Sequence, residues 1–367
     1  MKIIDITPFF HSKSGGIRRY LLEKTKFLAD LPHIKHTIII PGEKGRIYKV
    51  NQSVVYEVSS FPVPFSGGYR YFRNFRDIEE ILMEEKPDIV EFGGIYHLLD
   101  RFRTNGYRKV AFYHSDVKLY LSLLPLPWYL RNAILREYFI PRLNKADLIL
   151  SPSHCHSAIL RSFGLERVKT LNLGLDTALF SPEKRDPFFC EKFGLSKDIV
   201  KLLYVGRLSP EKNIDLLLRI IEALDPKRFH LFIAGEGQER FKVEKCQNRL
   251  PNLTYLGYID NQEELASLYA SCDIFLSISR KETFGLSFLE AQASGCLLVS
   301  LDMGLETQPF KDFLVKSYDL REFKKLIEKA AQSLSESIRH SVSSYIRSHF
   351  SWEITFKRLL DYYRYIL

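Results

Sequence analysis

The stretch that decides the fold is SCDIFLSISRKETFGLSFLEAQASGCLLVSL, residues 271–301. Its first apolar run, DIFLSIS, and its last, CLLVSL, are typical of buried strands, and FGLSFLEAQAS between them predicts a helix that Gly295 ends. Glu282 lies in the loop and Glu290 in the helix, with seven residues between them. In such a β-loop-α-β unit, both carboxylates are expected at the carboxyl end of a strand, where open α/β sheets bind their ligands.

The start of this helix adds a second kind of binding group. We expect Phe284 and Gly285 to open the helix, so that their N–H groups are free and the positive end of the helix dipole favours an anion. Carboxylates suit hydroxyl groups as acceptors, and free amides suit phosphates. The unit therefore predicts a ligand that carries both hydroxyls and phosphates.

The motif E-T-F-G-L-S-x-L-E-A-x-A-x-G, which occupies residues 282–295, resembles a known family signature. It is similar to that of the retaining nucleotide-sugar glycosyltransferases of the GT-B architecture, the family-four-like group that contains bacterial mannosyl- and glucosyltransferases and sucrose synthases. The resemblance implies two doubly wound, Rossmann-like α/β domains that face a central cleft. It also implies that Glu282 contacts the donor sugar and that Glu290 contacts the ribose.

A second motif, YVGRLSPEKN, occupies residues 204–213. Gly206 and Arg207 come at the end of a predicted strand, and Lys212 follows just before a predicted helix. Two cations at the carboxyl edge of a sheet suit a diphosphate, because the charge that develops on a departing diphosphate must be stabilised. The segment resembles the family's Gly-Arg-Leu-x-x-x-Lys-Asn, whose Arg and Lys bind the donor pyrophosphate.

Glycines and a histidine follow other predicted strands. Gly15 and Gly16 come after the first strand, where the missing Cβ lets the backbone approach a ligand, and the resemblance puts such a pair near the donor phosphates. Glu236 and Gly237 belong to a Gly-x-Gly turn that lacks the third glycine and acidic partner of a dinucleotide site, and the family has a similar turn beside the nucleoside. His114, in His-Ser-Asp, resembles the histidine of the family's His-x-Asp segment, which reaches the donor sugar.

The sequence predicts no metal and no cofactor besides the nucleoside diphosphate sugar as co-substrate. Asp-x-Asp occurs nowhere in the chain, and Arg207 with Lys212 can replace the charge of a metal. His154-Cys155-His156 is rejected as a metal site, because adjacent residues on a helix point in divergent directions. No residue stands out as a nucleophile, which suits the front-face mechanism usually proposed for the family, in which the departing phosphate helps to deprotonate the acceptor.

The length of 367 residues suggests two domains. We expect a first domain over residues 1–180, a charged linker over 181–200, a nucleotide-sugar-binding domain over 201–349 and a helix over 350–367 that crosses back to the first domain. Residues 302–320 depart from the Gly-Gly-x-x-Glu pattern of the family. The choice of nucleobase and sugar is therefore left open.

The net charge of +9 is compatible with an anionic partner, and the absence of a nucleic-acid-binding motif argues against DNA or RNA. Two aromatic, proline-containing stretches of the first half, with nearby arginines, are candidates for an acceptor site or for contact with lipid headgroups. The helix after Pro127, which carries Trp128, is alternatively expected to be buried. The candidate residues are Phe61, Phe65, Arg70, Arg73 and Trp128.

These observations lead us to expect a retaining, metal-independent transferase that moves a hexosyl group to a lipid or a lipid-linked glycan. A soluble small-molecule or polysaccharide acceptor, a sugar-nucleotide epimerase of the same fold, and a non-catalytic nucleotide-binding peripheral membrane protein remain alternatives. Five scattered cysteines suit a reducing, cytoplasmic location, and no apolar run approaches the roughly 20 residues that span a bilayer. Peripheral contact with the inner face of the cell membrane is left open.

Overall fold

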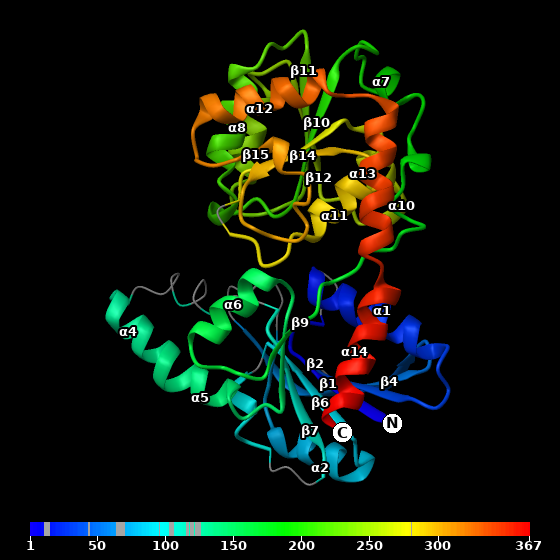
Figure 1. Ribbon diagram of the computed structural model, residues 1–367, viewed down its shortest axis with the longest axis vertical. Coiled ribbons are helices and arrows are strands. Elements are labelled where there is room, and N and C mark those ends of the chain that lie inside the picture. Colours follow the sequence, from blue (N-terminus) through cyan, green and yellow to red (C-terminus); the bar gives the residue numbers. More distant parts are fainter. Residues whose placement is uncertain are drawn as a thin grey trace. The chain divides into compact units, whose positions relative to one another are not determined.

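The computed structural model describes residues 1–10, 15–42, 45–63, 70–94, 96–102, 106–114, 117, 121, 126–279 and 281–367. The chain forms two compact units, one made of residues 1–173 and 352–367 and the other of residues 174–351. Each unit is built on a twisted, mainly parallel sheet with helices around it (Figure 1). The prediction of two doubly wound α/β domains is confirmed.

The sheet of the first unit has the strand order β3-β4-β2-β1-β6-β7-β8-β9. Its neighbouring strands are parallel except for β3 and β4, and β5 pairs antiparallel with β4. Because the chain builds outward from β1 in one direction and then returns to β6 on the other side, the topological switch point lies between β1 and β6. The strands are β1 (Lys2–Ile6), β2 (Lys35–Gly42), β3 (Ile47–Val50), β4 (Ser53–Pro62), β5 (Arg70–Phe72), β6 (Ile89–Gly93), β7 (Arg108–Phe112), β8 (Leu148–Ser151) and β9 (Val168–Thr170).

Helices of the first unit bury apolar faces against this sheet. The C-terminal helix α14 belongs to the unit and lies beside α1 (Figure 1). The helices are α1 (Gly16–Ala29), α2 (Phe75–Glu85), the 3₁₀ turn η1 (Tyr96–Leu98), α4 (Trp128–Ala133), the π-helical segment η2 (Ile134–Phe139), α5 (Ile140–Leu143), α6 (His154–Ser162) and α14 (Trp352–Ile366).

The second unit has an entirely parallel sheet with the order β12-β11-β10-β13-β14-β15. Its switch point lies between β10 and β13, so the two motifs that follow these strands meet there. The strands are β10 (Val200–Val205), β11 (Phe229–Ala234), β12 (Leu253–Gly257), β13 (Ile274–Ser277), β14 (Leu297–Leu301) and β15 (Leu314–Val315). The helices are α7 (Phe189–Lys192), α8 (Ile214–Ala223), α9 (Arg240–Gln247), α10 (Gln262–Ser271), α11 (Leu286–Ala293), α12 (Leu320–Gln332) and α13 (Glu336–His349), with 3₁₀ turns η3 (Pro182–Lys184), η4 (Pro210–Lys212) and η5 (Lys311–Phe313).

The expected limits of the domains differ from the observed ones. Residues 174–200, which we assigned to the end of the first domain and to a linker, belong to the second unit. Buried aromatic side chains hold them there: Phe180 packs 5.8 Å from Tyr269, and Phe189 packs 5.0 Å from Phe232, measured between ring centroids. Because this stretch is rich in charged residues, the sequence did not indicate that Phe180 and Phe189 are buried.

A group of ionisable side chains is buried between the sheet and the helices α1 and α14 of the first unit. We call it the buried polar cluster, and it consists of Asp5, Tyr20, Lys24, His36, Glu91 and Tyr363. Lys24 Nζ lies 2.8 Å from Asp5 Oδ1 and 3.5 Å from Glu91 Oε2. With one cation beside two carboxylates, burial raises the pKa of Glu91 to about 7.

This pKa predicts a specific dependence of stability on pH. The folded state holds the proton of Glu91 more tightly than the unfolded state does. The protonation of Glu91 therefore adds fully to the free energy of unfolding at low pH, and this addition is lost as the pH rises from 4.5 through about 7. Burial lowers the pKa of His36, His114 and His230, which gives an opposing trend. That trend is common to the wild type and to a Glu91 variant.

We therefore expect the Tm of Glu91→Gln, relative to the wild type, to increase by at least about 2 °C between about pH 5 and pH 8, because a tenfold difference in proton affinity is worth about 1.4 kcal/mol. Thermal unfolding followed by circular dichroism measures the difference. The exposed Glu84→Gln serves as the control. A constant difference in Tm across this range would contradict the assignment.

Candidate functional site

Lys212 and Glu282 form an ion pair at the switch point of the second sheet. Lys212 ends the turn η4 after β10, and Glu282 lies in the loop between β13 and α11. Because β10 and β13 are neighbours, Lys212 Nζ can donate a hydrogen bond to Glu282 Oε1. The side chains are 16% and 17% exposed. The pair therefore offers a cation and a carboxylate to one ligand at the solvent boundary.

Arg207 has a different environment. Its side chain is 78% exposed, and its guanidinium lies 3.5 Å from the carboxylate of Glu211 in the same loop. The backbone at Arg207 is held by the buried Tyr204, whose hydroxyl donates to the Arg207 carbonyl at 2.9 Å. The loop is thus fixed while the guanidinium stays accessible. The sequence did not predict that Tyr204 fixes this loop.

The glycines after β10 and β11 are required by the packing of the chain itself. A Cβ on Gly235 would lie 1.9 Å from the carbonyl oxygen of Gly206, and a Cβ on Gly237 would lie 2.2 Å from that of Leu208. Glu236 between them accepts a hydrogen bond from Leu208 N through its carbonyl, at 2.9 Å. The two loops therefore pack backbone against backbone, and this contact accounts for the Gly-x-Gly pattern without a ligand.

The helix α11 begins later than we expected. Its first residue is Leu286, and Gly285 is the N-cap with a left-handed φ of 84°. Phe284 precedes this N-cap and so does not open the helix, and its buried side chain packs against Phe350 with the ring centroids 6.3 Å apart. Thr307 fixes the same residue by donating to its carbonyl oxygen at 2.6 Å. The N–H groups that we expect to face an anion at this helix start are accordingly those that follow Phe284.

Glu290 is oriented by a residue that sequence reasoning missed. The hydroxyl of Tyr269, on α10, donates to Glu290 Oε2 at 3.0 Å, and the ring of Tyr269 is fully buried. No local pattern identifies Tyr269, because the contact depends on how α10 packs beside α11. The hydroxyl of Tyr269 therefore fixes the Oε2 end of the Glu290 carboxylate.

Gln308 organises the segment that departs from the family pattern. Its side-chain oxygen accepts from the N–H groups of Met303 and Leu305, at 3.0 and 3.3 Å, and its amide donates to Ser300 and Leu301 at the end of β14. One buried side chain therefore shapes the loop after β14. Sequence reasoning did not identify it, since a glutamine in a loop carries no distinctive signal.

In the first unit, His114 lies beyond the end of β7. Its ring lies 3.8 Å from that of Phe112, tilted by 32°, and 5.5 Å from that of Tyr20, both measured between ring centroids. Burial lowers the pKa of His114 to about 3, so the imidazole is neutral at physiological pH. Ser115 and Asp116 lie outside the described residues.

Gly15 and Gly16 lie at the start of α1, on the same edge of the first sheet as His114. Gly15 is the N-cap of the helix and is exposed, and a Cβ on it would meet no atom of the described residues within 4 Å. The packing of the described residues therefore does not require glycine at position 15, in contrast to positions 235 and 237. A ligand that approaches the backbone closely remains a reason for it.

The proposed acceptor or membrane residues fall into two places. Phe61 is exposed at the end of β4, Arg73 is exposed, and Arg70 donates to Ser60 Oγ at 2.8 Å. Phe65 lies outside the described residues. The expectation that the helix after Pro127 is buried is wrong: Trp128 is 70% exposed. Other exposed apolar side chains of this segment, which the sequence did not single out as exposed, are Tyr129, Leu130 and Tyr138.

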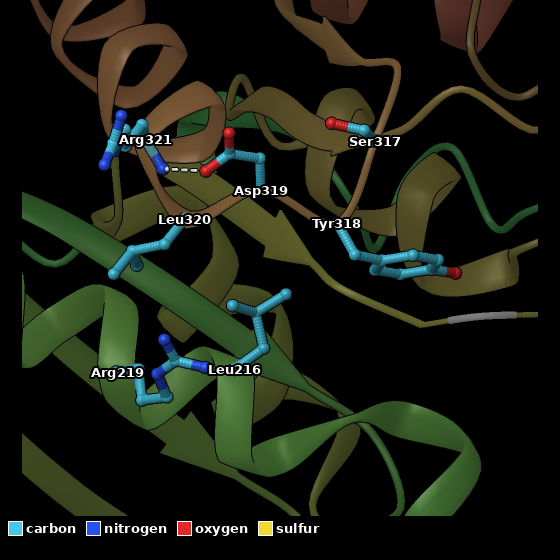
Figure 2. Close-up of a pocket in the computed structure, with 7 residues that line it drawn as sticks. All are labelled: Leu216, Arg219, Ser317, Tyr318, Asp319, Leu320 and Arg321. Carbon is cyan, nitrogen blue, oxygen red and sulfur yellow. Dashed lines mark hydrogen bonds between the residues drawn. The ribbon is translucent and has the colours of Figure 1, made fainter.

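A shallow cavity of the second unit has a volume of about 670 Å³ and lies between α8 and the start of α12 (Figure 2). Asp319 caps α12 there by accepting from Arg321 N, and Arg219 faces it from α8 (Figure 2). The described lining residues are Leu216, Arg219, Ser317, Tyr318, Asp319, Leu320 and Arg321. None of them is a predicted site residue, so the predicted motif residues at the switch point, and not this cavity, define the candidate site.

Among the described residues, no group of three or more His, Cys, Asp or Glu side chains is arranged to hold a metal ion. Within the same part of the chain, no helix is long and apolar enough to cross a bilayer.

Comparison with protein families gives two adjacent matches. Residues 14–179 match Glycosyltransferase Family 4, and residues 187–349 match the Glycosyl transferases group 1. The first match covers most of the first unit, and the second covers the unit that contains Lys212 and Glu282.

Curated relatives and solved structures agree with these matches. The chain is 29% identical over 261 residues to a GDP-mannose-dependent alpha-mannosyltransferase of Mycobacterium tuberculosis, covering 71% of this chain but only 65% of that protein. It is 27% identical over 306 residues to the GDP-mannose-dependent alpha-(1-6)-phosphatidylinositol dimannoside mannosyltransferase of the same species, covering 80% and 78%. Sucrose-phosphate synthase of Thermosynechococcus elongatus shares the fold, with a TM-score of 0.82 at 16% identity over 100% of this chain and 99% of the other.

Proposed function

Because the chain belongs to the nucleotide-sugar glycosyltransferases, with a family 4 first half and a group 1 second half, we propose that it transfers mannose from GDP-mannose to a lipid or lipid-linked glycan. Transfer proceeds with retention at the anomeric carbon and without a metal ion. The observation that carries the proposal is the Lys212–Glu282 pair at the switch point of the group 1 domain. The names of the two mycobacterial relatives support mannose and GDP as the first donor to test.

The proposed donor chemistry assigns one task to each polar group of the second unit. Lys212 and Arg207 stabilise the negative charge that develops on the departing diphosphate, a task that elsewhere falls to a metal ion. Glu282 accepts hydrogen bonds from sugar hydroxyls, and Glu290, oriented by Tyr269, accepts them from the ribose. The amides at the start of α11 favour the phosphates.

The proposed transfer balances without a protein nucleophile. The bond between the anomeric carbon and the phosphate oxygen breaks, and a bond from that carbon to the acceptor oxygen forms on the same face. The hydroxyl proton of the acceptor passes to the departing phosphate oxygen. Burial lowers the pKa of His114 to about 3, which makes the imidazole a weak base, so we assign it a hydrogen bond to the sugar and not a proton transfer.

A lipid acceptor is supported by the surface of the first unit. The segment from α4 to α5 exposes Trp128, Tyr129 and Leu130 on consecutive positions, with Arg136 exposed further along it. Aromatic rings beside cations suit the boundary between lipid headgroups and acyl chains. One relative is named for a phosphatidylinositol-based acceptor. The enzyme is proposed to bind the membrane surface that carries its acceptor.

We expect the variant with Trp128→Ser and Tyr129→Ser to bind anionic vesicles at least about tenfold less than the wild type, because burying one large apolar side chain is worth roughly 1.5–3 kcal/mol. Sedimentation with vesicles of phosphatidylglycerol and phosphatidylcholine measures binding. Raising the salt concentration should also weaken it through screening. Phe241→Ser, which changes an exposed aromatic residue of the second unit, is the control. Equal sedimentation of all three proteins would indicate a soluble acceptor.

The function itself is tested with the full chain in two steps. Thermal shifts with GDP, UDP, ADP and dTDP and their sugars identify the donor, and the largest stabilisation is expected with GDP-mannose. Radiolabelled donor is then incubated with membrane lipids, and label is expected in the organic extract with retained anomeric configuration by NMR, in the presence of EDTA. Conversion of the donor without an acceptor would indicate an epimerase, and no conversion under any condition would indicate a binding protein.

A further inference from the structure

The C-terminal helix α14 is hydrogen-bonded into the buried polar cluster of the first unit. Its Tyr363 donates to Glu91 Oε2, on β6, and accepts from Lys24 Nζ of α1 at 3.1 Å. The second oxygen of the same carboxylate accepts from the hydroxyl of Tyr20, on α1, at 3.1 Å. The ribbon shows α14 lying along α1 (Figure 1). One carboxylate on the sheet therefore holds a tyrosine from each of these helices.

The ring of Tyr20 connects this cluster to His114. On one side, its centroid lies 5.6 Å from that of Phe356 and 6.4 Å from that of Trp352, both on α14. On the other side, it lies 5.5 Å from that of His114, at an interplanar angle of 64°. Tyr20 is fully buried. The ring of Tyr20 therefore packs against His114 on one side and against the aromatic residues of α14 on the other.

We propose that Tyr20 is a positioning residue for His114, and that Glu91 and Tyr363 hold it, so that the C-terminal helix is part of the sugar-transfer site. The proposal rests on the role given to His114 in the proposed function. It adds residues that neither motif contains, from α1, β6 and α14.

The chemistry of His114 makes its orientation important. A neutral imidazole acts through one directed hydrogen bond, and small displacements of such groups reduce rates strongly. Phe112 fixes one face of the ring, and Tyr20 limits its tilt. Without the hydroxyl of Tyr20, its ring loses the hydrogen bond that sets its height above the sheet, and Glu91 loses one donor.

The cluster also supplies a measurable signature. The groups that face Glu91 are Tyr20 and Lys24 from α1, Asp5 from β1 and Tyr363 from α14, and His36 from β2 bonds the second oxygen of Asp5 at 2.6 Å. Burial raises the pKa of Glu91 to about 7, and the two tyrosine hydroxyls favour its charged form. Removing either hydroxyl should raise this pKa further. A residue that only supported the fold would lower the rate equally at every pH.

The test compares Tyr20→Phe and Tyr363→Phe with Tyr362→Phe in the full chain. Tyr362 is the neighbour of Tyr363 on α14, and its hydroxyl donates to the Thr170 carbonyl at 3.1 Å, away from the cluster. We expect kcat to fall between about tenfold and 10²-fold in the first two variants, while the KM for the donor stays unchanged. The pH at which the titration of Glu91 changes kcat should move upward in both. Tyr362→Phe should match the wild type.

His114→Ala separates this proposal from the proposed function. Unchanged transfer by His114→Ala would overturn the role of His114 and this positioning proposal with it, whereas absence of transfer by the wild type would overturn the proposed function itself. Strongly reduced transfer by His114→Ala, together with wild-type behaviour of Tyr363→Phe and Tyr20→Phe, would overturn only the positioning role. If either phenylalanine variant fails to fold, Glu91→Gln decides, because it keeps the shape of the carboxyl and should remove the inflection near neutral pH. An inflection that persists in Glu91→Gln would overturn the proposal.

Discussion

Replacing Lys212 by alanine is expected to lower kcat by at least about 10²-fold while the protein stays folded. The substitution removes the cation that forms an ion pair with Glu282 and that we assign to the departing diphosphate. The lost group is at the solvent boundary, so the core is unaffected. Steady-state rates at saturating donor and acceptor measure the effect, and circular dichroism verifies the fold.

Two variants make this result specific. Lys212→Ala also releases Glu282, whereas Arg207→Ala removes a cation whose partner is Glu211. A similar loss of kcat in Arg207→Ala would therefore show that the loss comes from the missing positive charge and not from the release of Glu282. Lys242→Ala is the matched control, since Lys242 forms ion pairs with Asp215 and Glu239 on α8 and at the start of α9. Rates near those of the wild type in both Lys212→Ala and Arg207→Ala would remove these residues from the site.

Substitutions of Glu282 and Glu290, the two carboxylates of residues 271–301, are expected to have different effects. Glu290→Gln should weaken the binding of bare nucleoside diphosphate, by about tenfold, because a hydrogen bond to a charged group is worth roughly 1.5–3 kcal/mol. Glu282→Gln should leave that binding nearly unchanged and lower the rate of sugar transfer by about 10²-fold. Isothermal titration with the nucleotide and steady-state kinetics separate the two effects.

The hydrogen bond from Tyr269 offers an independent check. Tyr269→Phe keeps the buried ring and removes only the donor to Glu290, so it should show the binding defect of Glu290→Gln in a weaker form. Glu263→Gln, on the exposed face of α10, should bind nucleotide as the wild type does. If Glu290→Gln bound the bare nucleotide as tightly as the wild type, the contact with the ribose would be excluded.

The sequence by itself determined the class of fold and the positions of the two main motifs. Runs such as DIFLSIS and KLLYVG are apolar on both faces, as strands of a covered parallel sheet must be, and each is followed at once by Glu282 or Arg207 within a short loop. Because these signals are local, they predicted that Lys212 and Glu282 each follow the carboxyl end of a strand. The contact between Lys212 and Glu282 follows once β10 and β13 are known to be neighbours in the sheet.

Only the tertiary structure decided which residues support those motifs. Tyr363 reaches Glu91 across 272 positions of the chain, and Tyr269 reaches Glu290 across 21. In the tertiary structure, residues 174–200 belong to the second unit. Trp128 is exposed there, although the apolar pattern had suggested that its helix is buried. In each case the outcome depends on which surfaces meet after the sheets form. Local composition and periodicity report the environment that a segment prefers, and they do not report the distant partner that provides it.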